Sequence, residues 1–322
     1  MRALAAAALL LLCACTSAAR KSPGALSSPA RSPSTSAAAA PSYVAVPGPV
    51  GLAALAGRVW AVSARDGTVV AIDPATGKIT ERVHVGSSPL RAVADGHLLW
   101  VSVFGAGRLV AVDPSTGKVV RRVVVPGQPE GLATGFGSIW VVRQRARRLT
   151  RVSPAGRVGP SYRLGREPRL VTATDQYLIV SDFGGGTLTR IDPSSGKTAT
   201  SARLCNGPQG LASSGTTVWV ACTTQGVVLA VDERTLQVTG RLAVAHEPDA
   251  VRVYGGRVYV VATLGPTLHE LADDPRHPAL LRSRKLGEAF MLHDQANVDL
   301  VLAAGSVLVT SFGQGRVYRT AN

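Results

Sequence analysis

Apolar residues recur along this chain in short runs that return at a nearly fixed interval. Within residues 85–125, the apolar run Leu98-Leu99-Trp100-Val101 is followed by turn-forming groups such as Asp113-Pro114-Ser115-Thr116-Gly117. Near-copies of this stretch fill most of the chain, and each has one aromatic or aliphatic residue at its centre. These anchors are Trp60, Trp100, Trp140, Ile179, Trp219, Tyr259 and Leu308, at intervals of 40, 40, 39, 40, 40 and 49 residues.

Each copy reads as four short antiparallel strands. In the second copy the pattern predicts strands over 91–94, 98–103, 108–112 and 119–125, separated by turns rich in Gly, Asp and Pro. The middle strands are apolar on both faces, which is typical of strands packed between two neighbouring sheets. A period near forty residues with four strands per period predicts a β-propeller blade.

The ends of the repeat region predict how the ring closes. A proline stands eleven residues before each of the first six anchors, and Asn297 takes that place in the seventh copy. Residues 43–46 align with the fourth strand of a copy, whereas the seventh copy has only three strands. We therefore expect an all-β, seven-bladed β-propeller over residues 43–322, closed by an N-terminal strand that completes the C-terminal blade.

The repeat resembles the YVTN-type β-propeller repeat and, more loosely, the NHL and streptogramin B lyase propellers. The resemblance rests on Val59-Trp60-Ala61-Val62, Val70-Ala71-Ile72-Asp73 and Val85-Gly86-Ser87-Ser88-Pro89, with their counterparts in the other copies. It implies the fold. It does not imply one activity, because propellers carry many unrelated functions.

The N-terminal residues predict export. A short basic start and the apolar run Ala3 to Leu12 read as a signal peptide over residues 1–14, and Leu12-Cys13-Ala14-Cys15 resembles the lipobox of bacterial lipoproteins. That resemblance implies lipidation of Cys15 and an extracytoplasmic, membrane-anchored protein; the alternative is simple secretion. Residues 15–42 are rich in Ala, Ser and Pro, so we expect a flexible tether.

Two cysteines remain in the predicted propeller. Cys205 ends the fourth strand of one copy and Cys222 ends the second strand of the next. Both positions face the same rim of the ring, and an exported protein lies where disulfides persist. We predict a disulfide between them, the alternative being two buried thiols.

The charge of the chain is strongly positive and unevenly distributed. The net charge is +15, and arginines crowd the third copy and the loop after it. An anion-binding face is predicted there for anionic envelope polymers, lipid headgroups or a protein partner, the alternative being a solvated basic face. Nucleic acid is not expected, because the aromatic residues belong to strands. The predicted anion-binding residues are Arg143, Arg145, Arg147, Arg166 and Arg169.

The enlarged interval before Leu308 places about seven extra residues, near 288–294, in a loop between blades. Histidines and carboxylates collect there and in the preceding loop. They suggest His246 and His293 as acid and base, with Glu247, Asp249, Asp294 and Asp299 as ligands of a divalent metal. The alternative is a set of ordinary polar loop residues, since no spacing matches a specific metal motif.

These observations favour a monomeric binding module of the bacterial cell envelope, tethered to the membrane and requiring no cofactor. No specific catalytic motif is present. The alternative is a metal-dependent lyase or hydrolase of the streptogramin B lyase type, working at the mouth of the central channel.

Overall fold

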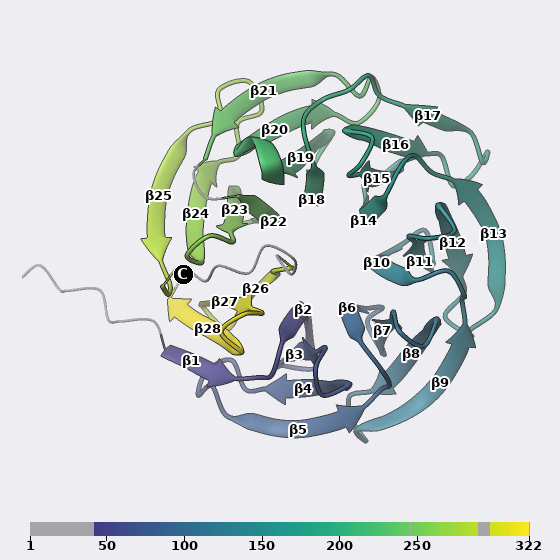
Figure 1. Cartoon of the computed structure of the whole chain (residues 1–322), viewed down its shortest axis with the longest axis vertical. Helices are drawn as coiled ribbons and strands as arrows, with labels where there is room; N and C mark the ends of the chain where they lie inside the picture. The colour runs from purple at the N-terminus through teal and green to yellow at the C-terminus, as the bar shows by residue number, and fades with distance from the viewer. Residues whose placement is uncertain (1–41, 245–246, 289–296, 322) are drawn as a thin grey trace, which may run out of the picture. The chain divides into compact units, whose positions relative to one another are not determined.

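Each predicted repeat forms one four-stranded antiparallel sheet, and the seven sheets follow one another around a ring (Figure 1). The computed structural model describes residues 42–244, 247–288 and 297–321, which belong to the compact unit Ala40–Asn322. The prediction of a seven-bladed β-propeller is confirmed. The blades are numbered 1 to 7 in chain order.

The first strand of each blade lies nearest the centre of the ring, and the second packs outside it (Figure 1). The first strands are β2 (Pro49–Leu55), β6 (Pro89–Ala94), β10 (Pro129–Gly135), β14 (Pro168–Ala173), β18 (Pro208–Ser214), β22 (Pro248–Tyr254) and β26 (Leu300–Ala303). The second strands are β3 (Arg58–Ser63), β7 (Leu99–Val103), β11 (Ser138–Arg143), β15 (Leu178–Asp182), β19 (Thr217–Cys222), β23 (Arg257–Ala262) and β27 (Ser306–Ser311).

The third and fourth strands complete each blade toward the outer rim. The third strands are β4 (Thr68–Ile72), β8 (Arg108–Asp113), β12 (Arg148–Val152), β16 (Thr187–Ile191), β20 (Val227–Asp232), β24 (Thr267–Ala272) and β28 (Arg316–Ala321). The outermost are β5 (Ile79–His84), β9 (Lys118–Val124), β13 (Val158–Arg163), β17 (Thr198–Thr200), β21 (Val238–Ala243), β25 (Leu280–Lys285) and β1 (Ser42–Ala45). One 3-10 turn, η1 (Thr223–Gln225), follows β19. Across the part of the chain that is described, no helix has the length and apolar character needed to cross a bilayer.

The two ends of the described chain meet in blade 7. Strand β1 pairs antiparallel with β28, with Ser42 opposite Arg319 and Ala45 opposite Arg316. The sheet order β1-β28-β27-β26 confirms that the N-terminal strand completes the last blade. This pairing covers the edge of β28 that would otherwise be free to bind another strand.

The core consists of seven apolar clusters, each formed where two neighbouring blades pack face to face. Between blades 1 and 2, for example, Trp60 packs with Leu99 and Val101. The four tryptophan anchors are at most 1% exposed. Both faces of the inner strands are therefore buried, which explains why their sequences are apolar throughout.

Cys205 and Cys222 form a disulfide that joins the loop between blades 4 and 5 to blade 5. Cys205 does not end the fourth strand as expected, because β17 already ends at Thr200. Cys222 is the last residue of β19, and Cys205 precedes β18 in the loop that enters the same blade. The predicted bridge is confirmed.

Candidate functional site at the channel mouth

A pocket of about 580 Å³ opens on the face of the ring where the loops between blades meet the turns between second and third strands. Blades 1, 2, 3, 4 and 7 all contribute to its wall. Its polar and aromatic lining residues are Arg65, Ser88, Phe104, Glu130, Gln144, Arg169, Asn297 and Phe312. The sequence predicted that the loops between blades and the turns between second and third strands share one face. Residues from both line this pocket.

The rim of the pocket is fixed by a repeated backbone hydrogen bond. The amide N–H of Phe104 donates to the carbonyl of Ser88 at 3.1 Å, and that of Gln144 donates to Gln128 at 2.9 Å. The accepting residue immediately precedes the repeated proline and has a left-handed backbone, with φ of 51° at Ser88 and 62° at Gln128. For residues other than glycine this conformation costs about 1–2 kcal/mol, so the rim stores local strain.

Arg169, one of the predicted anion-binding residues, lines the pocket. Its Nη1 lies 3.4 Å from Oε1 of Glu130, and its guanidinium stands 5.3 Å from the centre of the Phe183 ring. The Gln144 amide, with its oxygen turned toward Arg169, accepts from Nη1 at 3.2 Å and from Nε at 3.3 Å. These contacts hold the guanidinium in one place while leaving 30% of the side chain exposed.

The other four predicted arginines lie on blade 3 and the loop after it, and none of them is among the residues that line the pocket. Arg143 is half-buried and donates from Nε to the carbonyl of Pro126 at 2.5 Å, and Arg147 donates to that of Gly165 at 2.9 Å. Arg145 and Arg166 are exposed. Within the described ranges none of the four forms an ion pair with a carboxylate. Arg147 nevertheless acts electrostatically on the carboxylate of Asp182, and anion binding by these arginines stays a prediction.

The candidate metal site is described only in part. His246, His293 and Asp294 lie outside the described residues. Glu247 lies at the rim, where its carboxylate accepts from Thr263 at 3.3 Å, whereas Asp249 and Asp299 are buried. Among residues whose positions are described, no three His, Cys, Asp or Glu side chains come together as a metal site would require. The catalytic and metal roles stay predictions.

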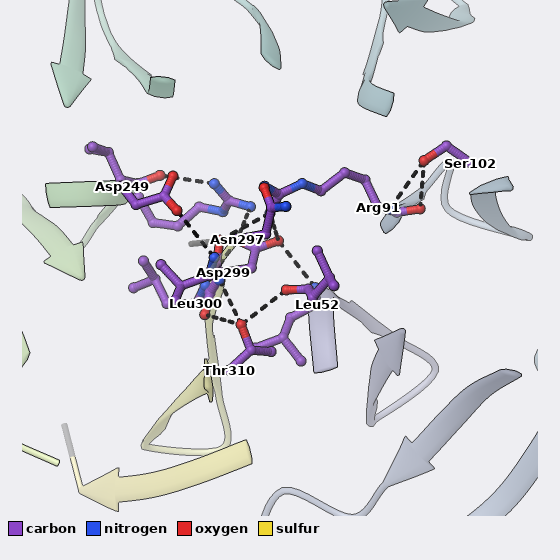
Figure 2. Close-up of polar contacts among 12 residues, drawn as sticks. Leu52, Arg91, Ser102, Asp249, Asn297, Asp299, Leu300 and Thr310 are labelled. Carbon is purple, nitrogen blue, oxygen red and sulfur yellow. Dashed lines mark hydrogen bonds and ion pairs between the residues drawn. The ribbon is translucent and has the colours of Figure 1, made fainter. Parts of the chain in front are cut away.

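Asp299 is buried and belongs to a network of polar contacts (Figure 2). Its Oδ1 accepts from Arg252 at 2.6 Å and its Oδ2 accepts from the backbone N–H of Leu52 at 3.1 Å. Arg91, only 5% exposed, lies 3.9 Å from the same carboxylate. The network therefore joins blades 1, 2, 6 and 7 across the channel.

Arg91 also holds the end of the loop that enters blade 7. Its Nη1 donates to the carbonyl of Val298 at 3.0 Å and its Nη2 donates to Oδ1 of Asn297 at 3.2 Å. Asn297 in turn lines the mouth pocket. A buried guanidinium thus sets the position of one wall of the pocket.

Four consecutive blades place a polar residue directly after the repeated proline, where blades 1, 2 and 7 have Val or Leu. Three of the four are almost fully buried: Glu130 is 1%, Gln209 5% and Asp249 0% exposed. The complete set is Glu130, Arg169, Gln209 and Asp249. The sequence analysis did not identify this half-ring of polar side chains as a group. The change from apolar to polar residues directly after the repeated proline could have indicated it.

The carboxylates of this half-ring are not ordinary surface acids. Burial raises the pKa of Asp249 to about 7, against the attraction of Arg91, and burial also raises the pKa of Glu130 against the attraction of Arg169. Within the described structure Oδ1 of Asp249, Oε1 of Gln209 and Nε of Arg91 have no hydrogen-bond partner. The channel thus holds several buried polar atoms able to bind a further group.

Comparison with known proteins adds to this geometry. Residues 45–159, less than half of the chain, match the family model described as outer membrane protein assembly factor BamB. A comparison with curated protein sequences gives no significant match.

Solved structures match over most of the chain but at low identity. A streptogramin B lyase is 15% identical with a TM-score of 0.71, covering 87% of this chain and 95% of that one. Hydrazine synthase from Kuenenia stuttgartiensis is 14% identical with a TM-score of 0.75, covering 91% and 99%. BamB from Moraxella catarrhalis is 17% identical with a TM-score of 0.58, covering 85% and 83%. At these identities the similarity shows the propeller fold alone.

Proposed function

We propose that this protein is an extracytoplasmic β-propeller that binds an anionic ligand at the mouth of its central channel. The observation that carries the proposal is the convergence of Arg65 and Arg169 on one pocket. Both guanidiniums stand over aromatic rings, Arg65 at 5.0 Å from the centre of Phe312 and Arg169 at 5.3 Å from that of Phe183. Planar, held guanidiniums suit carboxylate and phosphate groups.

The charges around the pocket support the same ligand class. Among the described residues that line the pocket, Glu130 is the only acidic side chain, and burial raises the pKa of that group. Arg143, Arg145, Arg147 and Arg166 add positive charge on the surrounding face. Such a face attracts polyanions over a distance and holds them by direct contact in the pocket.

The test is a binding measurement with polygalacturonate as the probe and dextran as the uncharged control polymer. All seven core clusters and the closing strand lie within residues 42–321, so the chain from Ser42 to its end contains the contacts of the fold. We expect the double variant Arg65→Gln/Arg169→Gln to bind polygalacturonate at least about tenfold more weakly than the wild type.

A matched control removes the same charge elsewhere. Arg121 and Arg122 are exposed on the outer strand β9, and Arg121→Gln/Arg122→Gln should change the affinity by less than about twofold. Equal losses in both double variants would show that net charge, and not the pocket, determines binding, and would refute the proposal.

The lyase alternative makes a different prediction about metal. A metal-dependent enzyme should contain a divalent ion on elemental analysis and should lose a metal-dependent rise in melting temperature in His246→Ala/His293→Ala. Polygalacturonate binding that is sensitive to salt but unaffected by a chelator and by this variant supports the binding module.

We also propose that residues 1–14 are removed as a signal peptide, that Cys15 carries the lipid, and that residues 15–42, the last of which begins β1, tether the propeller to the outer face of the membrane. The sequence around Cys15 supports this proposal. Partition of the full chain into a detergent phase, and its loss in Cys15→Ser, would test it. A Cys15→Ser variant that still enters the detergent phase would contradict lipidation.

A further inference from the structure

A second pocket, of about 550 Å³, lies on the face of the ring opposite the channel mouth, between blades 3 and 4. It is formed by the turn between β10 and β11, the turn between β14 and β15, and the hairpin that follows β16. Its volume is within the range of small-ligand sites, about 300–1,000 Å³. Residues of the channel do not contribute to it.

Phe136 stands at this pocket in a conformation that phenylalanine rarely adopts. Its φ is 51°, in the left-handed region, and its side chain is 38% exposed. The equivalent left-handed residues of the other blades are small: Ala56, Gly96, Gly215, Gly255 and Ala304. A large side chain in this backbone conformation carries local strain, and such strain clusters at functional sites.

A second aromatic ring faces the same pocket from blade 4. Tyr177 lines the pocket, and the guanidinium of Arg190 stands 4.7 Å from the centre of its ring. Arg190 is itself held by the carbonyl oxygens of Glu233 and Arg234. The pocket therefore has a ring on each side, contributed by adjacent blades.

Fixed polar groups accompany these rings. Arg151 is oriented by a hydrogen bond from Nε to Oγ of Ser138 at 2.7 Å, and among the described residues its terminal nitrogens form no ion pair. The side-chain oxygen of Gln176 accepts from Arg234 at 3.1 Å. The carboxylate of Asp192 accepts from Ser194 and Ser195, and these hydrogen bonds lower its pKa, so it stays ionised. Each group is held before any ligand arrives.

We propose that this pocket is a saccharide-binding site. Aromatic faces pack against the C–H groups of a sugar ring, while fixed guanidinium, amide and carboxylate groups bind its hydroxyls. The charged lining residues are Arg151, Asp175 and Asp192, so cations are not in excess, in contrast to the mouth. A polyhydroxylated ligand without a large charge fits this lining better than a polyanion does.

A peptide fits the pocket less well. Extended peptides are usually bound by adding a strand to a free sheet edge. This pocket is bounded by turns and a hairpin, and the described strands β11 and β15 next to it are paired on both sides. Hydroxyl groups do not need such an edge.

Calorimetric titration of chitotetraose, cellotetraose and maltotetraose into the chain from Ser42 onward tests the proposal. At least one of the three should bind the wild type, and Phe136→Gly should weaken that binding by about threefold to tenfold through loss of stacking. Arg151→Gln, which leaves Phe136 in place, should weaken it by about tenfold or more.

The matched control is Ala56→Gly, at the same turn position of blade 1 and with the same φ of 51°. It relieves backbone strain in the same way and should leave saccharide affinity unchanged. Both glycine variants should keep the wild-type circular dichroism spectrum, because glycine adopts a left-handed φ without strain. Phe136→Gly should also bind polygalacturonate as tightly as the wild type does.

Failure of all three oligosaccharides to bind, or equal binding by Phe136→Gly, Arg151→Gln and the wild type, would overturn the proposal without affecting the anion site. Loss of polygalacturonate binding in Phe136→Gly would also overturn it, because the two sites would then not be separate.

Discussion

Arg252 and Asp299 form an ion pair at the junction of blades 6 and 7, with 2.6 Å between Nη2 and Oδ1. The two partners differ in environment: the side chain of Asp299 is 4% exposed and that of Arg252 is 40% exposed. The same carboxylate accepts from the backbone N–H groups of Leu52 and Leu300. One buried aspartate thus connects the last blade to the first and to the sixth.

Asp299→Ala should therefore be strongly destabilising. It removes the acceptor of Arg252 and of two backbone N–H groups, and it removes the carboxylate that lies 3.9 Å from the buried guanidinium of Arg91. Such losses cost about 3–5 kcal/mol. Urea denaturation measures the free energy of unfolding. Asp66→Ala removes an exposed carboxylate of blade 1 and should change that free energy by less than about 0.5 kcal/mol. Equal values for the two variants would show that the Asp299 network does not hold the ring closed.

The stability of the wild type should depend on pH through Asp182. Burial raises the pKa of this carboxyl from 3.8 to about 6, although its carboxylate accepts from Thr189 at 2.5 Å and from the N–H of Gly165 at 2.9 Å. The folded state keeps a proton that the unfolded state releases. The contribution of the protonated Asp182 to the free energy of unfolding is therefore complete below about pH 4 and is lost as the pH rises through about 6.

Asp182→Asn cannot ionise and should lack this part of the pH dependence. Between about pH 4 and pH 7 the free energy of unfolding of the variant minus that of the wild type should therefore rise by on the order of 2–3 kcal/mol. Asp249 and Glu130 also have raised pKa values, so the difference between the variant and the wild type isolates Asp182. A difference that stays constant from pH 4 to pH 8 would show that the pKa of Asp182 is not raised.

The disulfide between Cys205 and Cys222 closes a loop with a sequence separation of 17. Cys205→Ser/Cys222→Ser should lower the free energy of unfolding by about 3 kcal/mol, mainly because the unfolded chain becomes less restricted. Dithiothreitol should lower the melting temperature of the wild type and leave that of the double variant unchanged. A wild type that is insensitive to full reduction would contradict this prediction.

Two truncations separate the role of β1 from that of the residues before it. Removal of residues 1–41 keeps β1 and should give a soluble monomer by size-exclusion chromatography with light scattering. Removal of residues 1–45 deletes β1 and exposes the edge of β28, so we expect lower stability and association between chains. Monomeric, equally stable products from both truncations would show that closure by β1 is dispensable.

The fold was predictable because the same residue types recur at the same spacing. In blade 2 the predicted strands 91–94 and 98–103 correspond to β6 (Pro89–Ala94) and β7 (Leu99–Val103). The earlier start of β6 depends on a bulge between Pro89 and Ala92. A bulge is a feature of the pairing between strands, and the apolar pattern of one strand does not reveal it.

The site was predictable in location but not in its contacts. Arg169 and Asp299 were expected at the mouth, whereas Arg91 and Glu130 were not singled out. Arg91 binds the carbonyl of Val298, which is 207 residues away in the chain. Contacts across the ring form only when all the blades are assembled. The sequence of a single repeat therefore indicates which positions face the channel, but it does not indicate which residues contact one another there.

The pairing of β1 with β28 also determines the order of folding events. Oγ of Ser42 donates to the carbonyl of Arg319, 277 residues along the chain. As the chain is made or translocated from its N-terminus, blades 1 to 6 can form from contiguous sequence, but β1 has no partner until the last residues emerge. Closing so long a loop is slow compared with forming the hairpins within a blade. The open ring, with β1 waiting for β28, is therefore the intermediate that this topology should populate during biogenesis, and it is the state in which a chaperone would be most useful.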